Sequence, residues 1–468
     1  MLKKISLISL ITMVLLLAGC SNEKGNNLYI GVEGSNALGS SLGQIIRDDQ
    51  LTLINNLYKG LFEVSEDNKV IPVLVESFTY SEDGRIITLN IKEGFMWSDN
   101  TPITAENVVS GLKNNIANDQ GKFSYQYKYL DRKVEDNIRV NEDKQVEIYL
   151  SKEFTDFEKV LAMPIFYPVL NTEDPLVGPF SGDFVVEKKT KDKIILAPRD
   201  KEKAITEKKT ESVVFEYSLG KEKLLKGFQA KDYDVIFPET AIEEAKGEKI
   251  KAPALELLWL NGRSEDLEKL EGRKAIYQNL EKIDGIYPSR YRDESKFEKI
   301  IMKSEYTFNN PQLKLLILDG PKSLKTGEKI KEQLSKKLNL NIEVLAKPVD
   351  EYYASLREGD FDLALETWEG DYHGKNAYFE VFRNPLYNPL NASGINIPAI
   401  NDLQNQINRI ADSPEREIIF KDLEKKIVES VSAVVLSEGL EKESYIQRVK
   451  NVGLNSIYNY HDYSNIKY

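Results

Sequence analysis

Short apolar runs alternate with amphipathic helical patterns along most of the chain. One such unit joins apolar runs at 212–220 and 232–237 through a helix at Lys221–Lys231. A second unit joins three runs through two helices, at 313–320, 342–349 and 360–368. Strands that alternate with helices of this length predict βαβ units and mainly parallel sheets.

Two four-residue matches indicate that these units belong to two lobes of similar construction. Asp232–Val235 (DYDV) opens one apolar run, and Asp360–Leu363 (DFDL) opens another. Between them, Ala254–Asn261 (ALELLWLN) is predicted to be a strand that crosses from one lobe to the other. A chain of 468 residues is long enough for two or more domains.

Local signals predict several turns and helix starts. Asp83–Gly84 lies between apolar runs and predicts a hairpin. Thr104, Asp350 and Ser413 each precede a helical pattern, and each side chain can accept a hydrogen bond from a first-turn amide. We therefore expect these three residues to cap helices.

The strand predicted at Phe361–Trp368 ends in a group of residues suited to ligand binding: Trp368, Glu369, Gly370, Asp371 and Tyr372. Open α/β sheets bind ligands beyond the carboxyl ends of their strands. A large ring, a flexible glycine and two carboxylates would suit a small cation or an ammonium group. The alternative is that the two aromatic residues only cap a core and that Asp371 is solvated, since buried aromatic residues are common. This stretch alone leaves both readings open.

The amino-terminal residues 1–19 have the features of a secretory signal peptide, with two lysines followed by the apolar run Ile5–Leu17. Leu17–Cys20 (LAGC) resembles a bacterial lipobox, which implies cleavage before Cys20 and lipid attachment to that residue. The polar residues 21–27 (SNEKGNN) suit a tether. We expect a protein anchored by lipid to the extracytoplasmic face of the cell membrane.

Composition excludes several kinds of chemistry. Cys20 is the only cysteine, so the mature protein can form no internal disulfide and has no catalytic thiol. Two histidines, His373 and His461, cannot build a zinc cluster and offer little prospect of a His-based triad. The net charge of -12 argues against nucleic acid as a partner. Neither a cofactor nor a metal site is expected.

The stretch Tyr58–Val109 carries a series of spaced residues that resembles the signature of a known family, the extracytoplasmic substrate-binding proteins of oligopeptide, dipeptide and nickel ABC transporters (family 5). The matching residues are Tyr58, Gly60–Leu61, Pro72, Leu74, Glu76–Ser77, Asp83–Gly84, Leu89, Gly94, Trp97–Asp99, Pro102, Thr104–Ala105 and Val108. Val177–Phe180 (VGPF) looks like the family's Gly-Pro-aromatic turn, and Arg273–Tyr277 is similar to its helix at the opening of the second lobe. The usual proline after the crossing strand is missing.

The resemblance implies an α/β, two-lobed periplasmic-binding-protein-like fold of the class II type, with an extra subdomain in the first lobe and the ligand in the interlobe cleft. The expected signal peptide is 1–19 and the expected tether is 20–27. The first lobe is expected at 28–258, with a subdomain insertion at about 46–170. The second lobe is expected at 259–437, and residues 438–468 are expected to return to the first lobe.

Peptide-binding members of the family have a Trp-x-x-Asp-Tyr sequence whose aspartate pairs with the free amino terminus of the peptide. Trp368–Tyr372 matches this sequence, so Asp371 is the implied partner of the amino terminus. His373–Lys375 departs from the proline, aspartate and proline that often follow, which leaves peptide length and side-chain preference open. The resemblance implies a monomer that captures oligopeptides for the permease of an ABC importer and is no enzyme.

Two other functions stay open on the sequence. Some members of the family bind nickel or nickel chelates, although the chain offers only two histidines as imidazole ligands. A hydrolase with paired carboxylates, such as a glycoside hydrolase, is not excluded by a composition with 75 acidic residues. No nucleophile motif or glycine-rich phosphate loop supports an enzyme.

Overall fold

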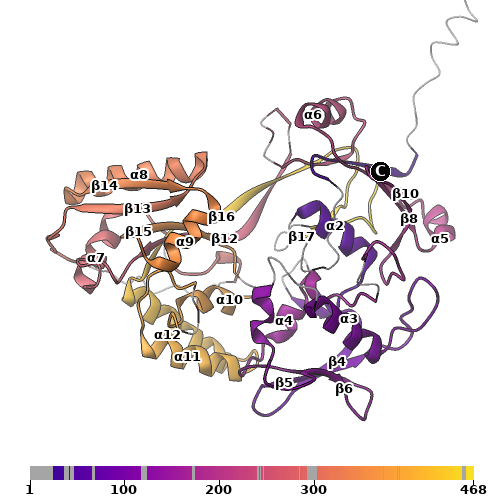
Figure 1. Ribbon diagram of the computed structural model, residues 1–468, viewed down its shortest axis with the longest axis horizontal. Helices are drawn as coiled ribbons and strands as arrows, with labels where there is room; N and C mark the ends of the chain where they lie inside the picture. Colours follow the sequence, from indigo (N-terminus) through magenta and orange to yellow (C-terminus); the bar gives the residue numbers. More distant parts are fainter. Residues whose placement is uncertain are drawn as a thin grey trace, which may run out of the picture.

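The computed structural model describes residues 25–35, 42, 47–65, 69–117, 124–170, 174–239, 242, 244–245, 247–283, 285–291, 303–370, 372, 374–386, 388, 390–455 and 460–468. Three residues singled out from the sequence, Cys20, Asp371 and His373, lie outside this set. The chain forms two lobes, which are joined at one side by a pair of long strands (Figure 1).

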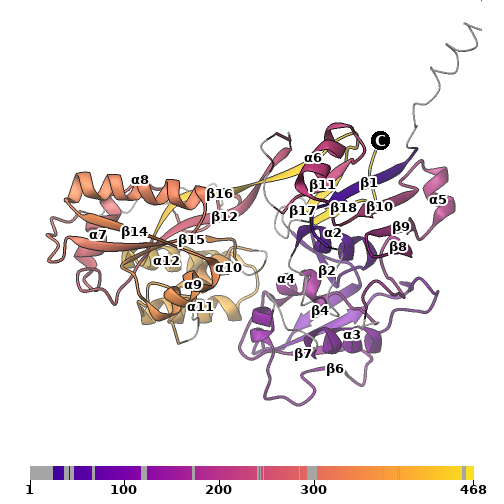
Figure 2. The ribbon, with the colours of Figure 1, turned by 45° about the horizontal axis from the view of Figure 1, so that its top comes forward.

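The two long strands are β12 (Glu248–Leu260) and β16 (Ala433–Ile446), and they pair antiparallel with each other. Both run from one lobe into the other (Figures 1 and 2). They lie inside one ten-stranded sheet of order β14-β13-β15-β12-β16-β11-β1-β10-β9-β8. The crossing strand predicted at Ala254–Asn261 is confirmed, but it begins earlier, and β16 crosses beside it.

In the first lobe, β1 (Asn27–Val32) lies between two parallel neighbours, β10 (Ser212–Glu216) and β11 (Val235–Phe237). Other elements of this lobe are α2 (Asp48–Leu57), β2 (Phe62–Val64), β3 (Val70–Pro72), β8 (Phe184–Lys189), β9 (Lys193–Pro198), α5 (Lys201–Thr206), α6 (Lys221–Gln229), β17 (Gly453–Asn455) and β18 (Tyr460–Asp462). The last strand returns to α2, where His461 accepts a hydrogen bond from Asn56 through its main-chain oxygen.

A smaller four-stranded sheet forms an extra subdomain of the first lobe (Figure 1). Its elements are β4 (Val75–Tyr80), β5 (Ile86–Ile91), α3 (Ala105–Ala117), η2 (Ser124–Tyr129), β6 (Ile138–Val140), β7 (Val146–Tyr149), α4 (Phe157–Leu161) and η3 (Pro164–Phe166). The hairpin predicted at Asp83–Gly84 joins β4 to β5, and Gly84 has a positive φ of 64°. Thr104 caps α3 by accepting from the amide of Asn107, which confirms that prediction.

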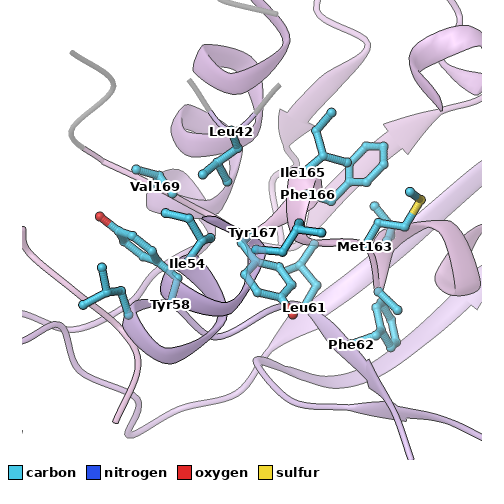
Figure 3. Packing of buried hydrophobic residues seen from close by; sticks show 14 of the residues in the cluster. Leu42, Ile54, Tyr58, Leu61, Phe62, Met163, Ile165, Phe166, Tyr167 and Val169 are labelled. Carbon is cyan, nitrogen blue, oxygen red and sulfur yellow. The ribbon is translucent and has the colours of Figure 1, made fainter. Parts of the chain in front are cut away.

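The core of the first lobe is continuous from the large sheet into this subdomain. Figure 3 shows a part of this core that includes Ile54 of α2, Tyr58, Phe166 and Tyr167. Trp97, in the turn that carries part of the family resemblance, is fully buried and donates from Nε1 to Asn107. This tryptophan is therefore part of the scaffold.

In the second lobe, β13 (Gln312–Leu318), β14 (Asn341–Lys347) and β15 (Leu363–Trp368) are parallel, and β15 pairs antiparallel with β12. Its helices are α7 (Leu270–Asn279), η4 (Ser289–Tyr291), α8 (Pro321–Leu338), α9 (Val349–Glu358), α10 (Asn376–Phe379), η5 (Glu380–Phe382), α11 (Pro398–Arg409) and α12 (Pro414–Ser430). The helices α8 and α9 cover opposite faces of this sheet and belong to different apolar clusters. The strands contribute to both clusters because successive side chains of a strand point to opposite faces.

The repeated Asp-aromatic-Asp sequence has the same structural role in both lobes. Asp234 accepts a hydrogen bond of 2.9 Å from the amide of Tyr29 in the neighbouring strand β1. Asp362 accepts one of 2.8 Å from the amide of Lys314 in the neighbouring strand β13. In each lobe the second aspartate thus fixes the start of a strand against its parallel neighbour.

Two predictions from the sequence are wrong. The large sheet is mixed rather than mainly parallel, because the hinge strands and the β8–β9 hairpin pair antiparallel around a parallel trio in each lobe. Asp350 does not cap α9. Pro348 occupies the cap position, its carbonyl accepts from the amide of Tyr352, and Asp350 lies inside the first turn. A negative charge there still favours the helix start.

Ser413 caps α12 as predicted and accepts from the amide of Arg416 at 3.2 Å.

None of the helices within the described ranges combines the length and apolar content needed to cross a bilayer.

Candidate functional site

The end of β15 lies where the two lobes meet. Trp368 pairs in register with Leu255 of β12 and packs in the core of the second lobe. Tyr372, only four positions later, packs in the core of the first lobe. Both side chains are buried, with 8% and 3% of their surface exposed. The predicted ligand segment therefore bridges the two lobes.

Trp368 carries an unused hydrogen-bond donor. Its indole Nε1 is buried and has no acceptor among the described residues. A buried donor without a partner costs about 1 to 3 kcal/mol. An acceptor brought by a ligand, such as a peptide carbonyl, would remove that cost.

Gly370 gives the segment its bend after the strand. Its φ of 79° lies in the left-handed region, and an added Cβ would lie 3.2 Å from Cζ of Tyr378 and 3.3 Å from Cβ of Ala377. The hydroxyl of Tyr378 also donates to the main-chain oxygen of Glu369 at 2.8 Å. Backbone conformation and close packing both require glycine here.

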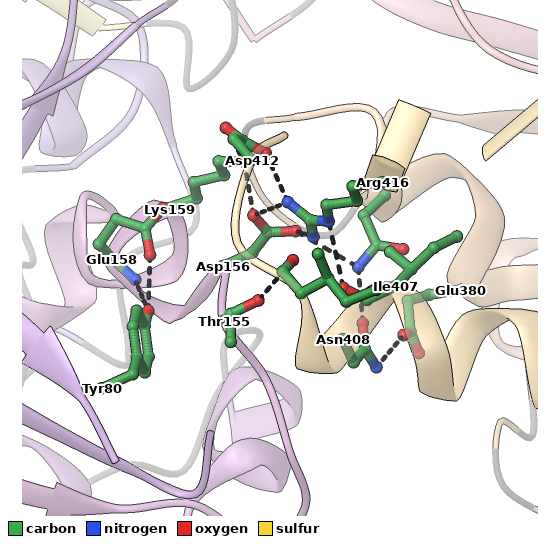
Figure 4. A network of polar contacts seen from close by, with 12 residues as sticks. Tyr80, Thr155, Asp156, Glu158, Lys159, Glu380, Ile407, Asn408, Asp412 and Arg416 are labelled. Carbon is green, nitrogen blue, oxygen red and sulfur yellow. Dashed lines mark hydrogen bonds and ion pairs between the residues drawn. The ribbon is translucent and has the colours of Figure 1, made fainter. Parts of the chain in front are cut away.

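A buried ion pair links the lobes beside this segment (Figure 4). Asp156, just before α4 in the first lobe, accepts from both terminal nitrogens of Arg416 in α12, with an Nη1–Oδ1 distance of 2.9 Å. Both side chains are almost fully buried. Burial alone would raise the pKa of Asp156, but the nearby positive charges of Lys159 and Arg416 hold this pKa well below its usual value. The carboxyl group is therefore ionised and fully paired.

Further contacts extend this interface along Lys152–Lys159. The amide of Thr155 donates to the main-chain oxygen of Asn408 at 2.9 Å, and its hydroxyl donates to the main-chain oxygen of Ile410 at 3.0 Å. Lys152 lies 3.3 Å from Glu380 of the second lobe. Against the effect of burial, Lys152 and Arg383 lower the pKa of Glu380 to about 2. One short segment of the first lobe thus makes backbone, hydroxyl and ionic contacts with the second.

Glu158 stands in the same segment but behaves differently. Burial, together with the charge of Asp156, raises its pKa to about 7. Tyr80 donates a hydrogen bond of 2.6 Å to its carboxyl group. This acid points into the first lobe and makes no ion pair across the interface among the described residues.

Other candidates from the sequence do not join the segment. His461 is buried in the first lobe, with its ring nitrogens 3.0 Å from Ser444 Oγ and 3.2 Å from Tyr463 OH, and burial lowers its pKa to about 4. Within the described part of the chain, no cluster of three or more His, Cys, Asp or Glu side chains could hold a metal ion. Two surface cavities, of about 1000 and 460 Å³, lie on the first lobe and include none of the residues of the segment.

Sequence reasoning missed Asp156 and Arg416, although a signal for Arg416 exists. The buried stripe of α12 runs through Phe420, Leu423 and Ile427, and Arg416 occupies the preceding position of the same stripe. A charged residue on an apolar stripe predicts a buried partner, because an unpaired buried charge is very costly. The identity of that partner could not be predicted.

Comparison with known proteins agrees with this architecture. The family described as "Bacterial extracellular solute-binding proteins, family 5 Middle" matches residues 69–282, which include most of the extra subdomain and the hinge strand β12. This middle part of the chain is similar to the family. Family 5 solute-binding proteins are transport proteins, and the two-lobed α/β fold expected from the sequence is confirmed.

Individual relatives of this chain are distant in sequence. The oligopeptide-binding protein OppA of Bacillus subtilis (strain 168) is 21% identical over 451 residues, covering 80% of both chains. The unliganded open form of MppA, a periplasmic murein tripeptide binding protein, superposes with a TM-score of 0.75 at 16% identity and covers 93% of this chain and 95% of its own. The pheromone receptor PrgZ superposes with a TM-score of 0.63 at 18% identity, covering 95% and 99%.

Proposed function

We propose that this protein captures oligopeptides outside the cytoplasm and delivers them to the permease of an ABC importer, as a monomer held at the membrane by lipid on Cys20. One observation carries the proposal. The segment that matches the peptide-binding Trp-x-x-Asp-Tyr sequence passes from the core of one lobe to the core of the other within four residues. The similarity to the oligopeptide-binding protein OppA, the murein tripeptide binding protein MppA and the peptide-binding pheromone receptor PrgZ supports a peptide ligand.

The chemistry of the segment suits a peptide. Asp371, which lies outside the described residues, supplies a carboxylate for the free amino terminus, because an enclosed ammonium group needs a fixed counter-charge. Trp368 offers its unpaired Nε1 to a main-chain carbonyl. Glu369, Gly370 and Tyr372 complete the site through main-chain and ring contacts. Main-chain recognition at a strand end provides affinity without demanding particular side chains.

Closure of the lobes is the second part of the proposal. We divide the chain into a first lobe at 28–258 and 438–468 and a second lobe at 259–437, with β12 and β16 as the hinge. A saturating peptide should lower the radius of gyration measured by small-angle X-ray scattering. An unchanged radius in a sample with calorimetrically confirmed binding would contradict large closure.

The peptide site is tested by Asp371→Asn, which keeps the size and removes the charge. Loss of one partner of a buried ion pair costs about 3 to 5 kcal/mol, and at about 1.4 kcal/mol per factor of ten the dissociation constant should rise by roughly two orders of magnitude. Calorimetry with a peptide that co-purifies with the protein, and with its N-acetylated form, measures this. The acetylated peptide should bind poorly to both proteins.

Asp319→Asn is the matched control, because Asp319 is an exposed acid of the same lobe. The control should bind the free-amine peptide like the wild type. If Asp371→Asn also did so, the assignment of Asp371 would be wrong while the fold would stand. A thermal-shift scan with Ni²⁺ tests the nickel alternative, for which a rise in melting temperature would be the supporting result.

A further inference from the structure

The chain that follows the proposed amine site is held by residues of the opposite lobe. The ring of Tyr372 makes edge-to-face contacts with Phe154 and Tyr129 of the extra subdomain, with centroid distances of 5.4 and 6.2 Å. Edge-to-face pairs of this kind contribute about 0.5 to 1.5 kcal/mol beyond burial. The position of Tyr372 is therefore set by the first lobe and not by its own.

The residues after Tyr372 contact charged side chains of the same subdomain. A Cβ built on Gly374 would lie 3.2 Å from Cδ of Lys159, so this lysine packs directly against the turn. Lys159 is itself held by Asp156 at 2.5 Å. Asn376 donates to Asn408 at 2.8 Å and lies 3.5 Å from Oδ2 of Asp156. Asp156 thus connects the turn after the ligand segment to α12.

We propose that Asp156 is a positioning residue for peptide binding: through Lys159, Asn376 and Arg416, it fixes from the first lobe the segment of the second lobe that receives the amino terminus of the peptide. This inference rests on the proposed function, because it concerns the same site. The extra subdomain then contributes to the peptide site, although Asp156 itself need not contact the peptide.

The physical reason is the cost of moving a buried charge. Asp156 satisfies two buried cations at once, so Lys159 and Arg416 have one low-energy arrangement while the carboxylate is present. Replacing it by asparagine leaves Lys159 and Arg416 with the largely exposed Asp412 as their remaining counter-ion. This favours other arrangements in which the two cations turn toward water. Lys159 would then withdraw from Gly374, and the turn would lose its fixed position.

The test uses the full chain and compares Asp156→Asn with Asp136→Asn. Asp136 belongs to the same subdomain, but its ion pair with Lys113 is exposed. Calorimetry measures the ratio of affinities for a free-amine peptide and its N-acetylated form. Hydrogen exchange measures protection of the amides at Tyr372 and Gly374–Asn376 without any peptide. We expect the affinity ratio to fall about tenfold in Asp156→Asn, equivalent to about 1.4 kcal/mol, and the amides to exchange faster.

Two further variants separate positioning from general destabilisation. Asp156→Glu keeps the charge and should restore part of the ratio. Asp156→Asn/Arg416→Met removes both partners of the ion pair and leaves fewer unpaired buried charges than the single variant. The double variant should therefore fold even if the single variant does not. It should also show the lower affinity ratio and the faster amide exchange. An affinity loss equal for the two peptides, or an unchanged ratio with unchanged exchange, would overturn the proposal. A wild type without preference for the free amine would instead count against the proposed function.

Discussion

The indole Nε1 of Trp259 in β12 donates a hydrogen bond of 2.6 Å to the carboxyl group of Glu366 in β15. The two residues are diagonal neighbours on one face of the antiparallel pair, since Trp259 lies opposite Ala364 and Glu366 lies opposite Leu257. Burial raises the pKa of Glu366 to about 7, although the bond from Trp259 acts in the opposite direction. An acid without a cationic partner among the described residues therefore stands two positions before Trp368.

Glu366→Gln should change how stability depends on pH. The folded protein holds the proton of Glu366 up to about pH 7, whereas the unfolded chain releases it near 4.5, so the wild type loses stability as the pH rises through this interval. The variant lacks this loss. Its free energy of unfolding, relative to the wild type, should increase by up to about 3 kcal/mol between pH 4.5 and 8.

Urea denaturation at several pH values measures this difference. Glu343→Gln is the control, because Glu343 is exposed on strand β14 of the same sheet. The control should show no comparable trend. A constant difference between Glu366→Gln and the wild type across the interval would show that Glu366 is ionised in the folded protein.

His461 should give a trend of the opposite sign. Burial lowers its pKa from 6.5 to about 4, so the folded protein keeps it neutral while the unfolded chain takes up a proton below 6.5. Its contribution to stability is present above pH 6.5 and is lost as the pH falls toward 4. His461→Gln should be less stable than the wild type at pH 7.5, and the gap should narrow by roughly 2 kcal/mol at pH 4.5. A gap of constant size would contradict the neutral, buried imidazole.

Gly370→Ala should strain the ligand segment. Alanine is unfavourable at a φ of 79°, and its Cβ would press on Tyr378 and Ala377. We expect a loss of about 1 kcal/mol or more in stability, together with weaker peptide binding. Gly327→Ala in α8 is the contrast, because its Cβ would meet only ordinary contacts of 3.4 Å or more and helix propensity favours alanine. Thermal unfolding should therefore rank Gly327→Ala above the wild type and Gly370→Ala below it.

Cys20→Ala tests the anchor. Without the thiol, lipid cannot be attached, so the mature form should disappear from the membrane fraction that detergent extracts. Immunoblotting of fractionated cells measures this. If the mature variant stayed with the membrane as firmly as the wild type, the lipoprotein assignment would be wrong, while the peptide site would be unaffected.

The sequence by itself determined the features that depend on neighbouring residues. Thr104 and Ser413 cap their helices, and Asp83–Gly84 turns a hairpin, because each device needs only atoms a few positions away. The strand that ends at Trp368 follows from its own apolar run. Asp350 shows the limit even of local reasoning, because Pro348, two positions earlier, takes the cap instead.

Only the tertiary structure decided what surrounds the ligand segment. Asp156 and Arg416 are 260 positions apart, and nothing near either residue in the chain identifies the other as its partner. Tyr372 follows a strand of the second lobe in the sequence, yet its ring packs against Phe154 of the first lobe. Such pairings depend on how two independently formed cores are set against each other by β12 and β16. That arrangement pairs the buried charges of Asp156 and Arg416, which would be costly alone, and it leaves no periodic pattern in the sequence.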